Sequence, residues 1–192
     1  MIRKMFFPLT LLFTGTVAQA ADSYTIDPVH STVGFSVTHL VINAVKGKFD
    51  EFSGAIVVDN GVVQQAKGMI LAKSINTGVE ARDKDLRGES FFDVEKYPTI
   101  TFQSKKSEKK GNETIVTGDF TMHGVTKEIA LPIKITGPIK DPWGNTRIGI
   151  HAAMKLNRKD YGLNYNKMLE TGGLVVGDEI EIEINAEATT GK

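Results

Sequence analysis

Cysteine is absent from the 192 residues, so no disulfide braces the fold and no thiol chemistry is available. Charge of one sign is not in excess, because 23 Lys and Arg stand against 23 Asp and Glu. Such a balanced, interspersed pattern argues against a nucleic-acid binder. Motifs for a nucleophilic serine, for a phosphate-binding loop and for dinucleotide binding are also absent. A chain of this length can nevertheless bury one adequate hydrophobic core.

Long apolar runs are missing except at the N-terminus. There, two basic residues precede the mostly apolar segment Met5 to Val17, and Ala18-Gln19-Ala20 has the form of a signal-peptidase site. The apolar segment is shorter than the ~20 residues that span a bilayer. We interpret residues 1–20 as a signal peptide cleaved after Ala20, which leaves residues 21–192 as a single exported domain. The signal type favours a bacterial periplasm.

Alternation of apolar and polar side chains is the main pattern of the remaining chain. In Thr32 to Leu40, Val33, Phe35, Val37 and His39 fall on one face, as expected of a half-buried strand. Similar stretches, separated by Gly, Asn and Pro turn signals, occur at 24–29, 46–59, 66–75, 99–104, 113–122, 125–136, 147–158 and 178–188. About eight short antiparallel strands predict an all-β sandwich or barrel, and small closed barrels of this size hold one ligand.

One charged stretch without alternation interrupts the strands near residues 80–97. Asp83 to Leu86 favours a short helix that Gly88 would end, and Asp93 to Lys96 favours a following turn. The sequence therefore predicts one short helical insertion, with no domain boundary and no internal repeat.

Residues that could carry catalysis or bind a metal do not form a recognisable pattern. The four histidines, His30, His39, His123 and His151, show none of the paired spacings typical of zinc sites. We therefore predict no catalytic residue, no metal site and no cofactor. What the chain offers is apolar: ten Phe, one Trp and many aliphatic residues on strands.

Several short motifs follow one another along nearly the whole exported chain: Ile26-Asp27-Pro28-Val29-His30-Ser31, Phe35-x-Val37-x-His39, Gly47-Lys48-Phe49 with Phe52-x-Gly54, Asn76-Thr77-Gly78, Arg82-Asp83-Lys84-Asp85-Leu86-Arg87, Phe91-Phe92-Asp93, Tyr97-Pro98-x-Ile100-x-Phe102, Gly118-Asp119-Phe120-Thr121-Met122-His123-Gly124-Val125-Thr126-Lys127 and Arg158-Lys159-Asp160-Tyr161-Gly162. In their order and spacing they resemble the YceI-like family of periplasmic polyisoprenoid-binding proteins. The resemblance implies an antiparallel, lipocalin-like barrel that holds a long apolar chain such as an isoprenoid, a polyprenyl lipid or a fatty amide. It implies no enzymatic activity.

On this hypothesis the candidate ligand-binding residues are those that could line the barrel or meet a head group. The candidate lining residues are Phe35, Val37, His39, Phe49, Phe52, Leu86, Phe91, Phe92, Phe102, Phe120, Trp143, Met154 and Tyr161. Arg82, Arg87 and Arg158 could meet an anionic head group, because guanidinium forks match phosphate oxygens. Surface ion pairing is the alternative role for these three arginines.

Two other functions remain open at the level of sequence. One is a lipid- or quinone-modifying enzyme with His39 or His30 as acid or base, which requires a histidine facing the cavity beside a carboxylate. The other is a structural or stress-related protein whose barrel is filled by its own side chains. An unpaired edge strand at either terminus could support a homodimer.

Overall fold

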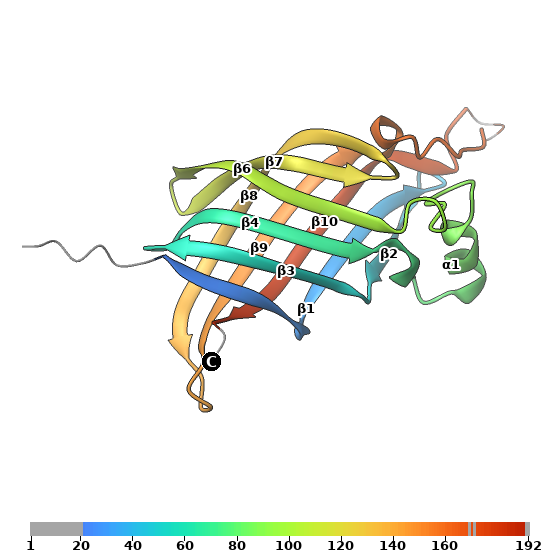
Figure 1. Ribbon diagram of the computed structural model, residues 1–192. Coiled ribbons are helices and arrows are strands. Elements are labelled where there is room, and N and C mark those ends of the chain that lie inside the picture. The colour runs from blue at the N-terminus through green and yellow to red at the C-terminus, as the bar shows by residue number, and fades with distance from the viewer. Residues whose placement is uncertain (1–20, 169, 171, 191–192) are drawn as a thin grey trace, which may run out of the picture.

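The computed structural model describes residues 21–168, 170 and 172–190, so the predicted signal peptide lies outside the described residues (Figure 1). It contains ten antiparallel strands and one α-helix. The strands are β1 Asp22–His39, β2 Asn43–Phe49, β3 Phe52–Asp59, β4 Val62–Leu71, β5 Ile75–Asn76, β6 Thr99–Lys110, β7 Glu113–Met122, β8 Val125–Lys140, β9 Thr146–Asn157 and β10 Val176–Thr189. The helix α1 is Glu80–Arg87, and short 3-10 turns occupy Ala72–Ser74 and Arg158–Tyr161.

The sheet closes on itself because β1 has partners on both sides. It pairs with β10 on one side, and on the other it pairs with β3 near its start and β2 near its end. The closed ring consists of β1, β3, β4, β6, β7, β8, β9 and β10. The predicted antiparallel barrel of about eight strands is therefore confirmed. The first and last strands pair with each other, so the terminal edge that suggested a homodimer is used within the barrel.

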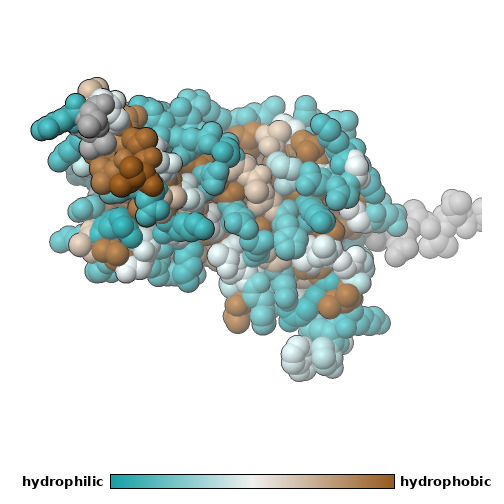
Figure 2. All heavy atoms as spheres, turned by 180° about the vertical axis from the view of Figure 1, so that it is seen from behind, coloured by the Kyte–Doolittle hydropathy of each residue, from teal (hydrophilic) through white to brown (hydrophobic). Residues whose placement is uncertain are grey.

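The barrel has two different ends (Figure 1). The terminal end holds the start of β1, the end of β10 and the tight β3–β4 and β6–β7 turns. The helix end holds α1, the β1–β2 turn and the long connection from β9 to β10. Polar side chains cover much of the outer surface, as expected from alternation (Figure 2). No helix among the described residues is long and apolar enough to cross a membrane.

The first strand differs from the sequence prediction. The stretches 24–29 and 32–40 are predicted as separate strands, yet β1 is one strand of 18 residues. A register shift against β10 between Asp27 and Thr32 lies where the two stretches join. Pro28 is tolerated because a bulged segment does not need every ladder hydrogen bond.

The predicted helical insertion is confirmed, and it is longer than the four residues expected. Asp83 is buried and accepts hydrogen bonds from the Thr77 backbone N–H, at 2.9 Å, and from the Thr77 hydroxyl. Arg87 donates from Nε to the Lys73 carbonyl at 2.8 Å and from Nη2 to the Ile75 carbonyl at 3.0 Å. These bonds fasten α1 to the chain at the helix end, and α1 ends at Gly88.

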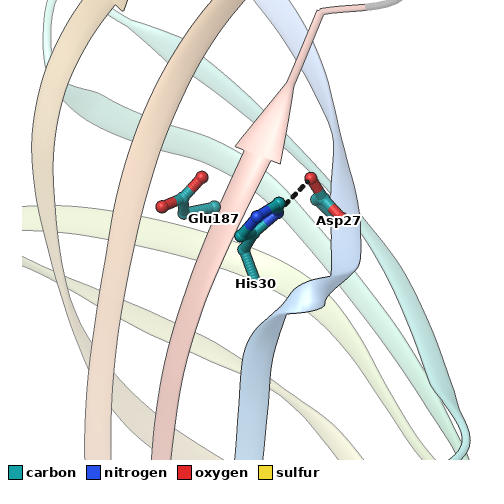
Figure 3. A group of neighbouring side chains, drawn as sticks. All are labelled: Asp27, His30 and Glu187. Carbon is teal, nitrogen blue, oxygen red and sulfur yellow. Dashed lines mark hydrogen bonds and ion pairs between the residues drawn. The ribbon is translucent and has the colours of Figure 1, made fainter.

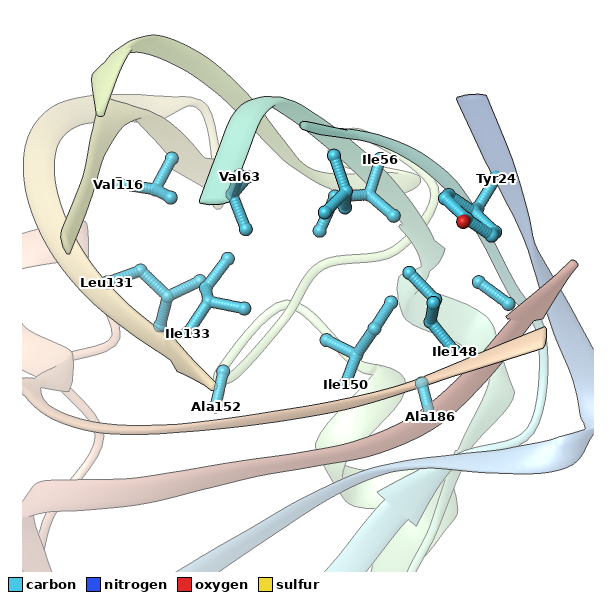
Figure 4. Packing of buried hydrophobic residues seen from close by; sticks show 12 residues of the cluster. Tyr24, Ile56, Val63, Val116, Leu131, Ile133, Ile148, Ile150, Ala152 and Ala186 are labelled. Carbon is cyan, nitrogen blue, oxygen red and sulfur yellow. The ribbon is translucent and has the colours of Figure 1, made fainter. Parts of the chain in front are cut away.

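Two hydrophobic clusters occupy the two halves of the barrel. The cluster of the terminal end comprises Tyr24, Ile56, Val58, Val63, Val116, Leu131, Ile133, Ile148, Ile150, Ala152, Ala186 and Ala188 (Figure 4). The cluster of the helix end comprises Val33, Phe49, Ala72, Ile75, Ile100, Phe120, Met122, Leu156, Tyr161 and Leu163. The terminal end is thus almost purely aliphatic, whereas aromatic rings are concentrated at the helix end.

Candidate functional site

A cavity of about 230 Å³ lies inside the barrel between the two ends. Every strand of the closed ring contributes to its wall, because alternation turns one face of each strand inward. On β10, Ile180, Ile182 and Ile184 line the cavity, while Glu179 and Glu181 alternate with them and pair with a surface lysine. The site is therefore a direct product of the period-two pattern.

The lining is almost entirely apolar. Among the lining residues only Ser53, Lys67, Thr101 and Arg158 have polar side chains, and none is an acid or a histidine. Lys67 is exposed, so its charged group reaches solvent. Such a wall excludes charge and favours an apolar guest.

A floor of buried side chains lies between the cavity and the terminal end, and Figure 4 shows several of them directed into the barrel. These side chains belong to the cluster of that end but do not line the cavity: Tyr24, Val58, Val63, Val116, Ile148 and Ala188. Each is at most 7% exposed. A long guest consequently has no route out through this end.

Two segments cover the cavity at the helix end. Leu86, Phe91 and Phe92 come from α1 and the loop after it, and Leu163 comes from the β9–β10 connection. The ring of Phe91 lies 4.5 Å, centroid to centroid, from that of Tyr165 on the β9–β10 connection. This end is therefore covered by two loops that meet through one aromatic pair.

Interior space arises where strands carry glycine. Gly54 of β3 is directly opposite Gly68 of β4, and both line the cavity. A Cβ at Gly68 would have only the Ser53 carbonyl oxygen nearby, at 3.8 Å. At Gly47, by contrast, a Cβ would collide with the ring of Phe35. At Gly54 a Cβ would lie 2.8 Å from the Lys67 carbonyl oxygen. Gly68 thus leaves room for a guest, whereas Gly54 and Gly47 leave room for neighbouring protein atoms.

Arg158 is the one buried charged side chain in the wall, at 3% exposure. Its Nε donates to the Gly177 carbonyl at 2.8 Å, its Nη1 to the Leu163 carbonyl, and its Nη2 to the Val176 carbonyl at 3.3 Å. Nη2 also lies 3.4 Å from Asp178 Oδ1. Burial lowers the pKa of this guanidinium from its ordinary value. Arg158 thereby ties the β9–β10 connection to β10.

Most residues predicted from the sequence to bind the ligand do lie on the cavity wall. They are Phe35, Val37, Phe49, Phe52, Leu86, Phe91, Phe92, Phe102, Phe120, Met154 and Arg158. The structure brings these side chains together from β1, β2, β3, β6, β7, β9, α1 and the loops of the helix end.

The other predicted residues lie elsewhere. His39 is half-buried at the end of β1, opposite Val176. Tyr161 is buried in the cluster of the helix end, with its ring 5.5 Å from that of Phe120. Trp143 is 72% exposed in the β8–β9 turn, where alternation gives no information about direction.

Two of the three predicted arginines also lie outside the cavity wall. Arg82 donates from Nε to the Thr77 hydroxyl at 2.7 Å, and Arg87 is held by the two backbone carbonyls described above. Their hydrogen bonds are made to the protein itself, so neither is placed to line the interior.

The aliphatic residues of the cavity wall were not named as site residues from the sequence, although their strands were predicted. They include Val33, Ile100, Ile129, Leu131, Ile133, Ile150, Leu156, Ile180, Ile182 and Ile184. The available signal was the alternation itself, which identifies an inward face but does not distinguish a filled core from a cavity wall.

A separate charged cluster on the outer surface contains Asp27, His30 and Glu187 (Figure 3). His30 Nδ1 lies 2.9 Å from Asp27 Oδ2. Arg147 Nη1 lies 2.9 Å from the same oxygen and 3.0 Å from Glu187 Oε2, and its Nε lies 2.8 Å from Asp141 Oδ2. The bonds from Arg147 and His30 lower the pKa of Asp27 to about 2. A guanidinium already occupies the centre of this group, which therefore has the form of an ion-pair network.

None of the four histidines, all within the described residues, lines the cavity. His123 Nδ1 lies 3.1 Å from the Tyr161 carbonyl, and His151 Nδ1 lies 2.8 Å from Asn185 Oδ1. The geometry that the enzyme hypothesis requires, a histidine facing the cavity beside a carboxylate, is thus not present among these residues.

A closed antiparallel barrel around an apolar interior defines the lipocalin-like class of architecture. Within that class, a model of the YceI-like domain family matches residues 24–188. The chain belongs to the YceI-like family.

Relatives and solved structures agree with this assignment. The UPF0312 protein SA2479 of Staphylococcus aureus is 34% identical over 168 residues, which cover 86% of this chain and 96% of the relative. The YCEI protein of Campylobacter jejuni is 32% identical with a TM-score of 0.69, over 81% of this chain and 90% of that structure.

Two more distant structures share the fold. BcnA of Burkholderia cenocepacia has a TM-score of 0.75 at 22% identity, over 85% of this chain and 99% of that structure. A structure described as a polyisoprenoid binding domain from Saccharophagus degradans has a TM-score of 0.67 at 17% identity, over 88% of this chain and 98% of its own.

Proposed function

We propose that this protein is a periplasmic binding or carrier protein that holds a long-chain isoprenoid, or a similar amphiphile, inside its barrel. The observation that carries the proposal is the cavity, which is walled by apolar side chains, closed by a floor at one end and covered by loops at the other. The remaining cavity volume argues against a barrel filled by its own side chains.

The shape of the cavity supports an extended guest. Its wall on β10 runs from Val176 to Ala186, a length of roughly 33 Å at the usual rise of a strand. With the strand tilt typical of barrels this corresponds to roughly 25 Å along the axis. A space of this length with a small volume suits a linear chain better than a compact ring system.

The free energy of burial is sufficient for binding. Each methylene taken from water into an apolar interior contributes ~0.8 kcal/mol, so ten methylenes contribute about 8 kcal/mol before opposing terms. Loss of translational freedom and ordering of the tail offset part of this gain. Affinity should therefore depend on tail length more than on the head group.

The lining also supports binding without chemical turnover. It contains no histidine, carboxylate or thiol, and Arg158 directs its N–H groups to backbone carbonyls. The description of the Saccharophagus degradans structure as polyisoprenoid binding makes prenyl compounds the first ligands to test.

The test uses protein stripped of endogenous lipid and a series of prenyl alcohols of two to eight isoprene units, with binding measured by native mass spectrometry and calorimetry. We expect one-to-one binding whose affinity rises with chain length until the cavity is full. Gly68→Leu should reduce affinity at least tenfold, because its side chain would project into the cavity beside Ala66 and Ile70. Gln65→Leu places the same side chain at an exposed position of β4 and should bind normally.

Failure of the protein to bind any prenyl alcohol or fatty amide saturably would contradict the proposal. Mass spectrometry of protein purified natively from its own cells would identify the head group. Periplasmic location is tested by fractionation together with N-terminal sequencing, for which we expect a chain beginning at Ala21. Protein retained in the cytoplasm with Met1 intact would contradict the predicted export.

A further inference from the structure

Exposed apolar side chains are gathered at the helix end of the barrel. Val41 and Ile42 in the β1–β2 turn are 64% and 86% exposed, and Met168 in the β9–β10 connection is 79% exposed. Figure 2 shows hydrophobic side chains gathered at this end of the molecule. Large exposed hydrophobic groups that lie close together mark interaction sites.

Backbone hydrogen bonds hold the two segments together. The Leu40 N–H donates to the Val175 carbonyl at 2.9 Å, and the Val175 N–H donates to the Lys167 carbonyl at 3.0 Å. Met168 also forms a bridge with Leu174. We call Val41, Ile42 and Met168 the apolar rim.

The β1–β2 turn is built against the usual preference of its residues. Leu40 and Val41 have φ values of 53° and 65°, a conformation that is unfavourable for bulky residues and especially for a β-branched one. The equivalent turns of this barrel use Asn60-Gly61 and His123-Gly124. The β1–β2 turn thus combines backbone strain with exposed apolar side chains, and a polar Asn would relieve both.

The apolar rim is continuous with the cavity wall. Val37 and Val176 line the cavity, and they lie directly beside the turn and the connection that carry the rim. The floor closes the opposite end, so a chain that enters or leaves along the barrel axis passes the helix end. Ile139 and Trp143 are also exposed, but they lie at the β8–β9 turn, away from this path.

We propose that the apolar rim docks the barrel on a lipid bilayer, so that an isoprenoid chain passes between membrane and cavity without crossing water. The inference rests on the proposed function, because a bilayer is where a free long-chain isoprenoid dissolves. Residues 40–49 contain no acid and include Lys46 and Lys48, and Met168 lies between Lys167 and Glu170. Basic residues thus outnumber acids along these two segments, which suits contact with phospholipid phosphates. Three side chains offer too little area for the ~800 Å² per partner of a stable protein interface. A reversible contact with a bilayer fits this small apolar area better.

The experiment measures co-sedimentation of the stripped full exported chain with sucrose-loaded phosphatidylcholine vesicles containing 20% phosphatidylglycerol, over a titration of lipid. Val41→Asn/Ile42→Ser should weaken vesicle binding at least fivefold, while the melting temperature stays equal or rises because strain at residue 41 is relieved. Ile139→Ser/Trp143→Ser removes exposed apolar side chains from the other end and should leave vesicle binding unchanged.

Two further readouts separate this inference from the proposed function. The rim variant should bind farnesol in lipid-free solution like the natural chain, whereas Gly68→Leu should lose prenyl alcohol binding and still sediment with vesicles. Equal vesicle binding by the natural chain and the rim variant would overturn docking by the rim, as would an equal loss in the Ile139→Ser/Trp143→Ser control. A rim-dependent dimer in sedimentation equilibrium, without vesicle binding, would instead assign the rim to a second copy and overturn the inference.

Discussion

At the terminal end, Tyr24, Val58 and Val63 are buried side by side, and a network centred on Arg147 braces the outside of the barrel. At the helix end, the cover consists of loops that meet through Phe91 and Tyr165. Alternating strands form both halves, yet one end is closed by packed side chains and the other is covered by the segments that connect strands. Access to the interior therefore depends on the segments that connect the strands at the helix end rather than on the strands themselves.

The charged groups of the two ends also act differently. Arg147 binds three carboxylates at the outer face of the barrel, so the loss of any single partner leaves it two others. Arg158 is buried and donates hydrogen bonds to backbone carbonyls inside the protein, where water does not replace a lost donor. Loss of the buried Arg158 guanidinium should therefore lower the free energy of unfolding much more than loss of one carboxylate partner of Arg147.

The largest effect is expected from Arg158→Met. It removes the donors to the Gly177, Leu163 and Val176 carbonyls and should lower the free energy of unfolding by about 3 kcal/mol. Lys159→Met is the matched control, because Lys159 shares Asp178 at 2.8 Å but is half-exposed, and it should cost at most about 0.5 kcal/mol. Urea denaturation measures both. Similar costs for the two variants would show that burial does not distinguish these cations.

A smaller effect should separate the floor from the cavity wall. Ile148 is 2% exposed in the floor, whereas Ile182 faces the cavity. Ile148→Ala should lower the free energy of unfolding by about 3 kcal/mol in its close-packed site, and Ile182→Ala by about 2 kcal/mol, because one side of Ile182 already borders the cavity. Only Ile182→Ala should change prenyl alcohol affinity. The distinction between floor and wall fails if the two variants are equally destabilised or both alter binding.

The smallest effect concerns pH at the terminal end. The pKa of Asp27 is lowered to about 2 from an ordinary value of 3.8, first by Arg147 and then by His30. Its ionised form therefore stabilises the fold by about 1–2 kcal/mol above pH 4, and this contribution is lost as the pH falls toward 2. The difference in unfolding free energy between the natural chain and Asp27→Asn should follow that course.

The control for this pH experiment is Glu113→Gln, at an exposed position of β7. Denaturation at pH 2, 3, 4 and 6 should show a pH-dependent difference for Asp27→Asn that exceeds the one for Glu113→Gln. A difference for Asp27→Asn that stays constant across this range would contradict the assigned role of its charge.

Much of the fold could be predicted because local signals agreed with tertiary structure. Residues 113–122 were predicted as a strand and form β7 with the same bounds, since Gly111-Asn112 and His123-Gly124 form turns at both ends. The stretches 24–29 and 32–40 were predicted as separate strands but form one, because pairing continues on both sides of a bulge. The helix was placed correctly but too short, because it begins at Glu80 and is fixed by bonds from Thr77, which lies before the predicted four residues, to Asp83.

The candidate site could be predicted only in part, for a related reason. Phe35, Phe102 and Phe120 lie on the cavity wall as their alternation indicated. Trp143 and Tyr161 do not, because a turn and a 3-10 segment have no period that fixes the direction of a side chain.

The sequence by itself determined the class of fold, since period-two alternation, glycine turns and the lack of cysteine admit few architectures besides an antiparallel barrel or sandwich. It also determined the apolar character of the interior, because the inward face of each strand is readable from alternation. Only the tertiary structure decided that the barrel closes through β1 and β10, that Gly54 and Gly68 pair on neighbouring strands of the cavity wall, and that Arg158 is buried. Those features depend on the register between strands distant in sequence, which no local pattern specifies.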